Sequence, residues 1–409
     1  SLLNIAKKHK YTLCIGRSHG IHAETTTFGL KILGYLAENK RNIDRLKNSI
    51  KQIQTIQMSG PVGTYSNIDT RIEQIIAKNP LRKQMLEGKY PSNCAGCYLQ
   101  EKHRPNNFDS ISSRLYYAKH LANKVPKDLF DSENNFTLKH VDIRWSNSCN
   151  QACVYCNPHY SSKWAQELGI KIPKDRESVN RLKEYIYKNI KTLTNVYLAG
   201  GEPLLMKENK DFLDRLYEVN PTCTVRVNSN LSKTSTGVMD SVCRFKDVHW
   251  TISIEAIEDQ YEYIRHHGNW KDFVSNLKKI SKLGHKISFN MLYFILTFKS
   301  VFKTVDFLKS LGFHNNSFVI GPMYTPESLN VLNLPKHLLD KCMAELKEEI
   351  NKKPGFLYQN SLENILSYLT DTKFYANIEA TLKSLKDMDL RRNNNSEKVF
   401  PELYREVLN

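Results

Sequence analysis

A regular alternation of short β-rich runs with helical stretches, between residues 138 and 325, constrains the fold more than any other feature of this sequence. The β-rich runs lie at 139–146, 195–201, 222–230, 248–256, 286–295 and 317–324, and helical periodicity occupies 176–191, 207–219, 234–245, 270–284 and 300–311. Strands that alternate with helices are typical of βαβ units and a parallel sheet. Because about six strands are visible and a closed barrel needs eight, the pattern predicts an α/β fold with an open, partial (β/α)6 barrel.

Composition limits the class of protein. The 409 residues are 40% hydrophobic and 25% charged, which indicates a globular protein of two or three domains. The net charge of +17 is spread along the chain without a dense Lys/Arg block, so we predict no specific nucleic-acid partner. No apolar run reaches 18 residues and no signal peptide is visible, so we expect a cytoplasmic protein with no membrane partner. Because the sequence begins with Ser1 inside a predicted helix, we expect a fragment of a longer chain.

Three of the nine cysteines lie on one short segment, "NSCNQACVYCNP" at 147–158, directly after the first predicted strand. Three thiolates do not fill a tetrahedral zinc site, and a complete iron–sulfur cluster normally takes four. Three ligands on a four-iron cluster would leave one iron open to a substrate or cofactor. The position is also suitable, because ligand sites in such barrels lie at the carboxyl ends of the strands.

The spacing of Cys149, Cys153 and Cys156, with Tyr155 before the last cysteine, resembles the Cys-x3-Cys-x-aromatic-Cys motif of the radical S-adenosylmethionine (radical SAM) superfamily. The resemblance implies two cofactors, a [4Fe-4S] cluster on these cysteines and SAM. It also implies reductive cleavage of SAM to a 5′-deoxyadenosyl radical, which abstracts hydrogen from a substrate that the sequence does not identify. A one-electron reductant such as flavodoxin or ferredoxin would be a partner.

Three further segments resemble cofactor-binding parts of that superfamily: "AGGEPLL" (199–205), "VNSNL" (227–231) and "SIEAIEDQYEYIRHHGNW" (253–270). The first is similar to the Gly-Gly-Glu-Pro motif that meets the methionine end of SAM, the second to the ribose contact, and the third to a strand and helix that hold the cofactor. The cofactor-binding residues implied by the resemblance are Tyr155, Gly200, Gly201, Glu202, Pro203, Asn228, Ser229, Asn230, Ser253 and Arg265.

A second cysteine pair, Cys94 and Cys97, lies upstream of the predicted barrel. The segment 81–97 resembles the closing half of a twitch- or SPASM-type module, which would make 81–137 a truncated auxiliary-cluster segment. Residues 326–409 similarly resemble a mostly helical twitch-type extension. Two thiolates hold a cluster only with other ligands. An auxiliary cluster, a vestigial pair, a site shared with another chain and free thiols therefore all stay open for Cys94 and Cys97.

The first 80 residues resemble a different family, adenylosuccinate lyase of the fumarase/aspartase superfamily. The resemblance rests on "GRSHGIHAETTTFGLK" (16–31) and "SGPVGTY" (59–65), and it departs at Ser18 and Thr25. Helical periodicity over 27–56 predicts a long amphipathic helix. The resemblance implies a proton-transfer role for His19, but the other catalytic segments and most of the helical bundle do not appear, so we predict an inactive His19. A metal site at His19 and His22 would lack a third ligand.

The two resemblances meet near residue 80 with no linker, although natural fusions usually join whole domains. We therefore hypothesise a chimera, produced by gene rearrangement, sequence assembly or an engineered join. The predicted order is a helical lyase-like fragment at 1–80, the auxiliary-cluster segment at 81–137, the radical SAM core at 138–325 and the extension at 326–409. The alternatives to a radical SAM enzyme are an adenylosuccinate lyase carrying the barrel as a passenger and an inactive chimeric chain.

Overall fold

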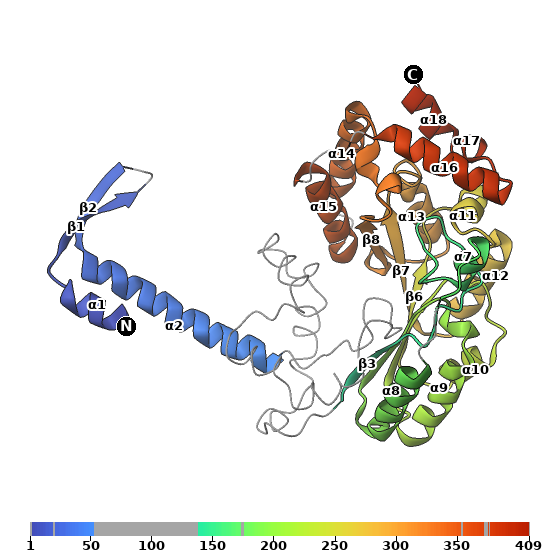
Figure 1. Cartoon of the computed structure of the whole chain (residues 1–409), viewed down its shortest axis with the longest axis horizontal. Coiled ribbons are helices and arrows are strands. Elements are labelled where there is room, and N and C mark those ends of the chain that lie inside the picture. The colour runs from blue at the N-terminus through green and yellow to red at the C-terminus, as the bar shows by residue number, and fades with distance from the viewer. Residues whose placement is uncertain are drawn as a thin grey trace. The chain divides into compact units, whose positions relative to one another are not determined.

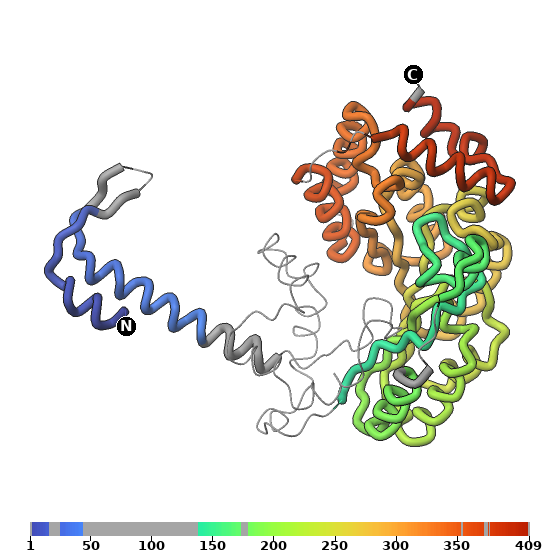
Figure 2. The backbone as a smooth tube through the Cα atoms, viewed as in Figure 1, coloured from blue at the N-terminus to red at the C-terminus, as the bar shows by residue number. Residues whose placement is uncertain are grey.

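The computed structural model describes residues 2–18, 21–52, 138–172, 176–352, 355–371, 375 and 377–408. Residues 2–52 and 138–408 belong to different compact units (Figure 1 and Figure 2). In the described ranges, no helix combines the length and the apolar character that a membrane span requires.

In the described part of the N-terminal unit, residues 2–18 and 21–52, a hairpin lies between two helices. Its elements are α1 (Leu2–Lys8), β1 (Leu13–Ser18), β2 (Ile21–Thr27) and α2 (Phe28–Gln52). The strands are antiparallel, with a register irregularity between Ile15 and Arg17. The long helix expected over 27–56 is confirmed as α2. The hairpin was not predicted, although β-branched residues such as Thr25–Thr27 favour strands.

The second unit is built on a parallel sheet, which confirms the predicted α/β fold and partial (β/α)6 barrel. Its six strands follow chain order across the sheet: β3 (His140–Ile143), β4 (Asn195–Leu198), β5 (Thr224–Ser229), β6 (Val248–Ser253), β7 (Lys286–Tyr293) and β8 (Phe318–Pro322). All five neighbouring pairs are parallel. Sequential order without reversal is the arrangement that successive βαβ units produce.

Helices connect the strands where the sequence predicts them. They are α8 (Arg176–Lys188), α9 (Lys207–Val219), α10 (Gly237–Cys243), α12 (Trp270–Ser281) and α13 (Val301–Ser310). The short helix α11 (Glu258–Ile264) lies in the segment 253–270, which the resemblance indicates as a strand and a helix. The short helix α7 (Ser162–Glu167) was not predicted, because its periodicity is too brief to stand out in a sequence.

The two faces of the sheet differ in polarity. Along β5 and β6, Val225, Val227, Trp250 and Ile252 are fully buried. The residues between them are polar and half-buried: Arg226, Asn228, Thr251 and Ser253. Since successive strand residues point to opposite faces, one face forms the hydrophobic core and the other is left for polar contacts.

The C-terminal part is helical, as predicted. It contains α14 (Lys336–Asn351), α15 (Phe356–Asp371), α16 (Ile378–Arg392), α17 (Ser396–Val399) and α18 (Pro401–Leu408), drawn in orange to red in Figure 1. Helix α15 packs on the edge strand β8, where the rings of Tyr358 and Phe318 lie 5.9 Å apart. Helix α16 returns to α11, since the Tyr263 hydroxyl donates to Asp389 at 2.8 Å. The extension therefore covers one edge of the sheet.

Candidate functional site

The three-cysteine loop follows β3 and is fixed by hydrogen bonds from two neighbouring segments. The Ser162 hydroxyl accepts from the Cys149 amide and donates to the Cys149 carbonyl, both at 3.0 Å. The Trp164 indole donates to the Cys153 carbonyl at 2.7 Å. The amides of Ala152 and Val154 donate to the backbone carbonyls of residues 266 and 264, at 3.0 and 2.8 Å. The loop is thus tied to α7 and to the end of α11.

Burial makes it costly for the three thiols to ionise without a metal. It raises the pKa of Cys149 to about 12 and of Cys156 to about 12, and repulsion from Cys153 adds to both shifts. The pKa of Cys153 is also raised by burial. Because like charges oppose one another, three thiolates in one loop need a strong cationic partner.

The donor set of the loop consists of three cysteine thiols on one short segment. In the parts of the chain that the structure describes, no group of three or more His, Cys, Asp or Glu side chains is arranged to hold one metal ion. Thiolate is the usual ligand of iron–sulfur clusters. Cys149, Cys153 and Cys156 therefore fit a cluster that has three protein ligands.

Gly200 and Gly201 are required by the chain's own backbone. A Cβ atom at Gly201 would lie 2.1 Å from the Ser148 carbonyl oxygen and 2.8 Å from the carbonyl carbon of Asn147. Gly200 has a backbone φ angle of +122°, a conformation that residues with a side chain rarely adopt. The next amide, that of Glu202, donates to the Ser148 carbonyl at 2.7 Å. The close approach that the two glycines allow thus joins the loop after β4 to the start of the cysteine loop.

The carboxylate of Glu202 joins this pair of loops to the end of β5. It is 1% exposed and accepts from the Leu204 amide at 3.1 Å, the Ser229 hydroxyl at 2.8 Å and the Asn230 amide at 2.7 Å. Burial raises the pKa of Glu202 to about 7, although these hydrogen bonds oppose the shift. Pro203 begins the short 3-10 helix η4 (Pro203–Leu205) and is buried. Glu202 therefore acts here as an internal connector between strand ends.

The end of β5 also reaches the first cysteine. The side-chain nitrogen Nδ2 of Asn230 lies 3.9 Å from Cys149 Sγ and donates to Asn150 Oδ1 at 3.2 Å. On the half-buried face of the sheet, the Ser253 hydroxyl donates to Asn228 at 3.3 Å. The structure thus places Asn228 and Ser253 side by side, with accessible surface remaining on both.

The side chains of Arg265 and Tyr155 bind one residue that sequence analysis missed, Glu255. Arg265 donates from Nε to Glu255 Oε2 at 2.8 Å and from Nη2 to Oε1 at 2.7 Å. The Tyr155 hydroxyl donates to Glu255 Oε1 and accepts from Arg265 Nη2, both at 2.9 Å. The signal in the sequence was a carboxylate inside the apolar run "ISIEA" at 252–256. Charged residues in such runs are seldom buried unless paired.

Several predicted residues lie outside the described residues. They are His19, Cys94 and Cys97, and the side chain of His22 is likewise not described. Their roles stay predictions.

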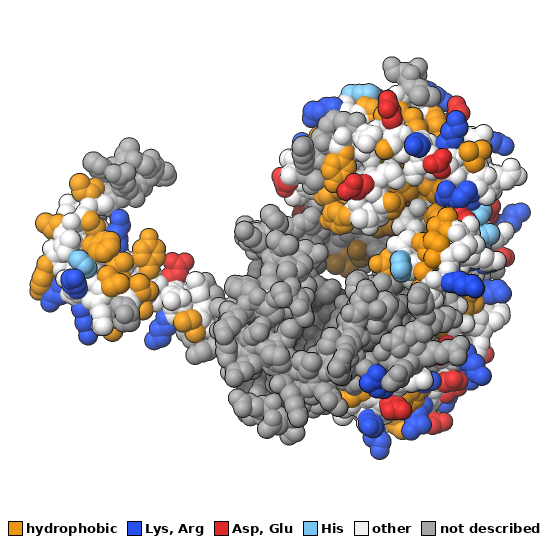
Figure 3. All heavy atoms as spheres, viewed as in Figure 1, with side chains coloured by type: hydrophobic (Ala, Val, Ile, Leu, Met, Phe, Trp, Pro, Cys, Tyr) orange, Lys and Arg blue, Asp and Glu red, His pale blue; other side chains and the backbone are white. Residues whose placement is uncertain are grey.

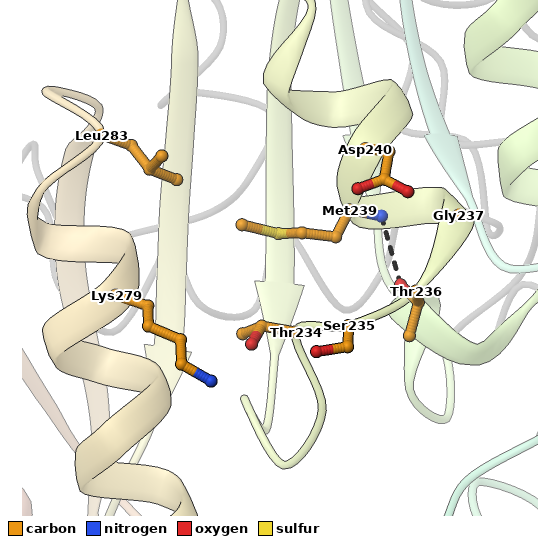
Figure 4. Close-up of a pocket in the computed structure, with 8 residues that line it drawn as sticks. All are labelled: Thr234, Ser235, Thr236, Gly237, Met239, Asp240, Lys279 and Leu283. Carbon is orange, nitrogen blue, oxygen red and sulfur yellow. Dashed lines mark hydrogen bonds between the residues drawn. The ribbon is translucent and has the colours of Figure 1, made fainter.

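The surface of the second unit contains a pocket of about 560 Å³, lined by Thr234, Ser235, Thr236, Gly237, Met239, Asp240, Lys279 and Leu283 (Figure 4). None of the predicted site residues lines it.

On the face seen in Figure 3, Lys and Arg side chains are mixed with Asp and Glu side chains over the described surface. This distribution agrees with the absence of a dense basic block in the sequence.

Comparison with known families separates the chain into two parts. The family model of the radical SAM superfamily matches residues 143–308, and a lyase family model matches residues 1–87. Adenylosuccinate lyase from Bacillus subtilis is 51% identical over 73 residues, 18% of this chain and 17% of that protein. The enzyme from Synechocystis is 54% identical over 70 residues, 17% of this chain and 16% of that protein. The chain therefore spans about a sixth of the length of these lyases.

Solved structures with a similar arrangement include Streptococcus suis SuiB bound to S-adenosylmethionine. That similarity has a TM-score of 0.38 and 13% identity, and covers 71% of this chain and 60% of that one. Native anSMEcpe with bound AdoMet has a TM-score of 0.39 and 15% identity, with coverage of 52% and 60%.

The contact at Gly201 predicts that alanine is not tolerated there. Its Cβ would overlap the Ser148 carbonyl, so the two loops must separate. We expect Gly201→Ala to lower the free energy of unfolding by about 1–3 kcal/mol, the usual cost of overpacking. Gly321→Ala is the matched control, because nothing lies within 4 Å of the place that its methyl group would take. Chemical denaturation of both full-length variants tests this, and equal stabilities would contradict it.

The raised pKa of Glu202 predicts a specific pH dependence. The folded protein takes up this proton near pH 7, whereas the unfolded chain does so near its ordinary value of 4.5. The carboxyl's contribution to stability is therefore fully present below pH 4.5 and is lost as pH rises through 7. Relative to Glu202→Gln, the cluster-free wild type should gain roughly 3 kcal/mol of unfolding free energy between pH 8 and pH 4.5. A difference between the two proteins that does not change with pH would contradict the assignment.

Proposed function

We propose that the radical SAM domain at residues 143–308 is the catalytic part of an enzyme that cleaves SAM reductively. The observation that supports the proposal is the loop after β3, which carries Cys149, Cys153 and Cys156 on one segment and is tied to α7 and α11 by hydrogen bonds. These cysteines would hold a [4Fe-4S] cluster. When bound, the cluster and SAM would supply the electron and the 5′-deoxyadenosyl group for hydrogen abstraction from a substrate.

The remaining residues would bind and orient SAM beside the cysteines. Asn228 and Ser253 keep accessible polar groups on the half-buried face of the sheet, which suits contacts to the ribose. Gly200 and Gly201 would present backbone groups to the methionine end of SAM. Ser229 and Glu202 are buried against each other, so we propose that they support this arrangement from behind without meeting the cofactor.

We propose the same domain order as the sequence indicates, with a radical SAM core at 138–325 and a twitch-type extension at 326–409. A one-electron reductant such as flavodoxin or ferredoxin would supply the electron, in the cytoplasm. The substrate class stays open, because the assigned residues would all serve the cofactors.

A second candidate function comes from the first 87 residues, where identity to adenylosuccinate lyases reaches 54% over 70 residues. Those lyases are about six times as long as the matching segment. We propose that this part has no lyase activity, because a catalytic histidine needs groups from other segments of the fold.

The cysteine loop generates the main functional prediction. After anaerobic reconstitution, the full chain should bind about four irons and form 5′-deoxyadenosine from SAM only when dithionite is present. The triple variant Cys149→Ala/Cys153→Ala/Cys156→Ala should lose both the iron and the product, because no thiolate ligand of the loop remains. Iron analysis and chromatography of the reaction mixture measure the two outcomes.

The matched control is Cys243→Ala, since Cys243 is exposed and stands alone in α10. It should keep the iron content and the rate of 5′-deoxyadenosine formation. If the triple variant still cleaved SAM, the proposed function would be refuted.

The lyase-like segment generates a negative prediction. The full chain should release no fumarate from adenylosuccinate above the background without enzyme, as followed by absorbance. Fumarate release that His19→Ala abolished would instead favour the lyase.

Sequencing the source DNA across codons 75–85 tests the chimera hypothesis, and continuous reads from one genome would exclude an assembly error.

A further inference from the structure

A buried ion pair lies beside the second cysteine of the loop. Arg265 and Glu255 are each 2% exposed, and they form two parallel hydrogen bonds of 2.7 and 2.8 Å. The third guanidinium nitrogen, Nη1, lies 3.9 Å from Cys153 Sγ, within hydrogen-bonding distance for sulfur. Arg265 thus divides its donors between a carboxylate and a cysteine sulfur.

The aromatic residue of the cysteine motif fixes this pair in place. The Tyr155 hydroxyl bridges Arg265 Nη2 and Glu255 Oε1, at 2.9 Å to each. Its ring packs edge-on against Phe294, with centroids 6.0 Å apart. The guanidinium therefore has contacts that set its plane as well as its position. We use the name Arg265 network for residues 153, 155, 255 and 265.

Stability alone is a poor explanation for such a network. A buried ion pair loses the hydration of both ions, and apolar residues of similar volume often give equal or greater stability. This pair lies where its charge acts on Cys153. The same sulfur also lies 3.8 Å from the Gln151 side-chain oxygen. The charge of Arg392 lowers the pKa of Cys153 as well, but less than the charge of Arg265 does.

We propose that Arg265, held by Glu255 and Tyr155, is a positioning residue that orients the Cys153 sulfur and sets the reduction potential of the cluster bound there. The inference rests on the proposed function, because it requires a cluster on Cys149, Cys153 and Cys156. Hydrogen bonds to cluster sulfurs and the net charge around them are known determinants of cluster potential. Adding an electron makes the cluster more negative, so a nearby positive charge favours the reduced state.

The two charges of the pair predict opposite effects. Removing the carboxylate leaves the guanidinium charge uncompensated, which stabilises the reduced cluster and raises the potential. Removing the guanidinium leaves the carboxylate near the sulfur, which destabilises the reduced cluster and lowers the potential. Both effects are strong in principle, because screening by water is weak at 2% exposure.

The test is a redox titration of the reconstituted full-length chain without SAM, followed by electron paramagnetic resonance. We expect Glu255→Gln to shift the midpoint potential upward and Arg265→Gln to shift it downward. The double variant Glu255→Gln/Arg265→Gln should return toward the wild-type value. Arg265→Lys keeps the charge and should shift the potential less than Arg265→Gln.

The control is Arg244→Gln, which removes an exposed arginine that pairs with Asp214, away from the cysteine loop. Its potential should equal that of the wild type. Shifts of the same sign in both single variants, or no shift, would overturn the inference, since general loosening of the loop has no reason to give opposite signs. If Arg265→Gln takes up no cluster, the direction of the Glu255→Gln shift decides the question.

Iron content separates this inference from the proposed function. A wild-type chain that binds no cluster would refute the proposed function itself. A wild type with a normal cluster, together with variants of unchanged potential, would refute only the role of the Arg265 network.

Discussion

The site depends on one backbone contact, that between the Gly200–Gly201 turn and residues 146–148. Neighbouring parallel strands end at the same edge of the sheet, so the loops after β3 and β4 must pass each other there. They do so with no room for a side chain at Gly201. The Glu202 amide then bonds to Ser148, and its carboxylate bonds to the end of β5. Three consecutive strand ends are thereby joined around the first cysteine.

Two buried carboxylates beside the cysteine loop, those of Glu202 and Glu255, each accept several hydrogen bonds. Glu202 collects hydrogen bonds from η4 and the end of β5, near Cys149. Glu255 holds Arg265 and Tyr155, near Cys153. Each carboxylate is costly to bury and therefore needs a full set of donors. These hydrogen bonds hold the segments around the cysteine loop together.

The N-terminal unit contrasts with this interlocked core. Helix α2 leaves Leu30 and Tyr35 more than half exposed, at 61% and 63%. A bundle helix normally buries such residues against neighbouring helices. The segment that matches the lyases amounts to about a sixth of their length. These facts agree with the proposal that this part contributes no catalysis of its own.

Much of this protein was determined by local sequence alone. The alternation of apolar and polar residues predicted all six strands and five connecting helices, because periodicity reports directly which face is buried. Cysteine spacing likewise identified the loop of the site, since ligands on one short segment need no tertiary information. The contacts of Glu255 with Tyr155 and Arg265 could not be found this way. Tyr155 and Arg265 lie 100 and 10 residues from Glu255 in the chain, and only the folded sheet brings the three side chains together. The same holds for the contact between Gly201 and the Ser148 backbone, because the two residues belong to different loops that meet only in the folded sheet.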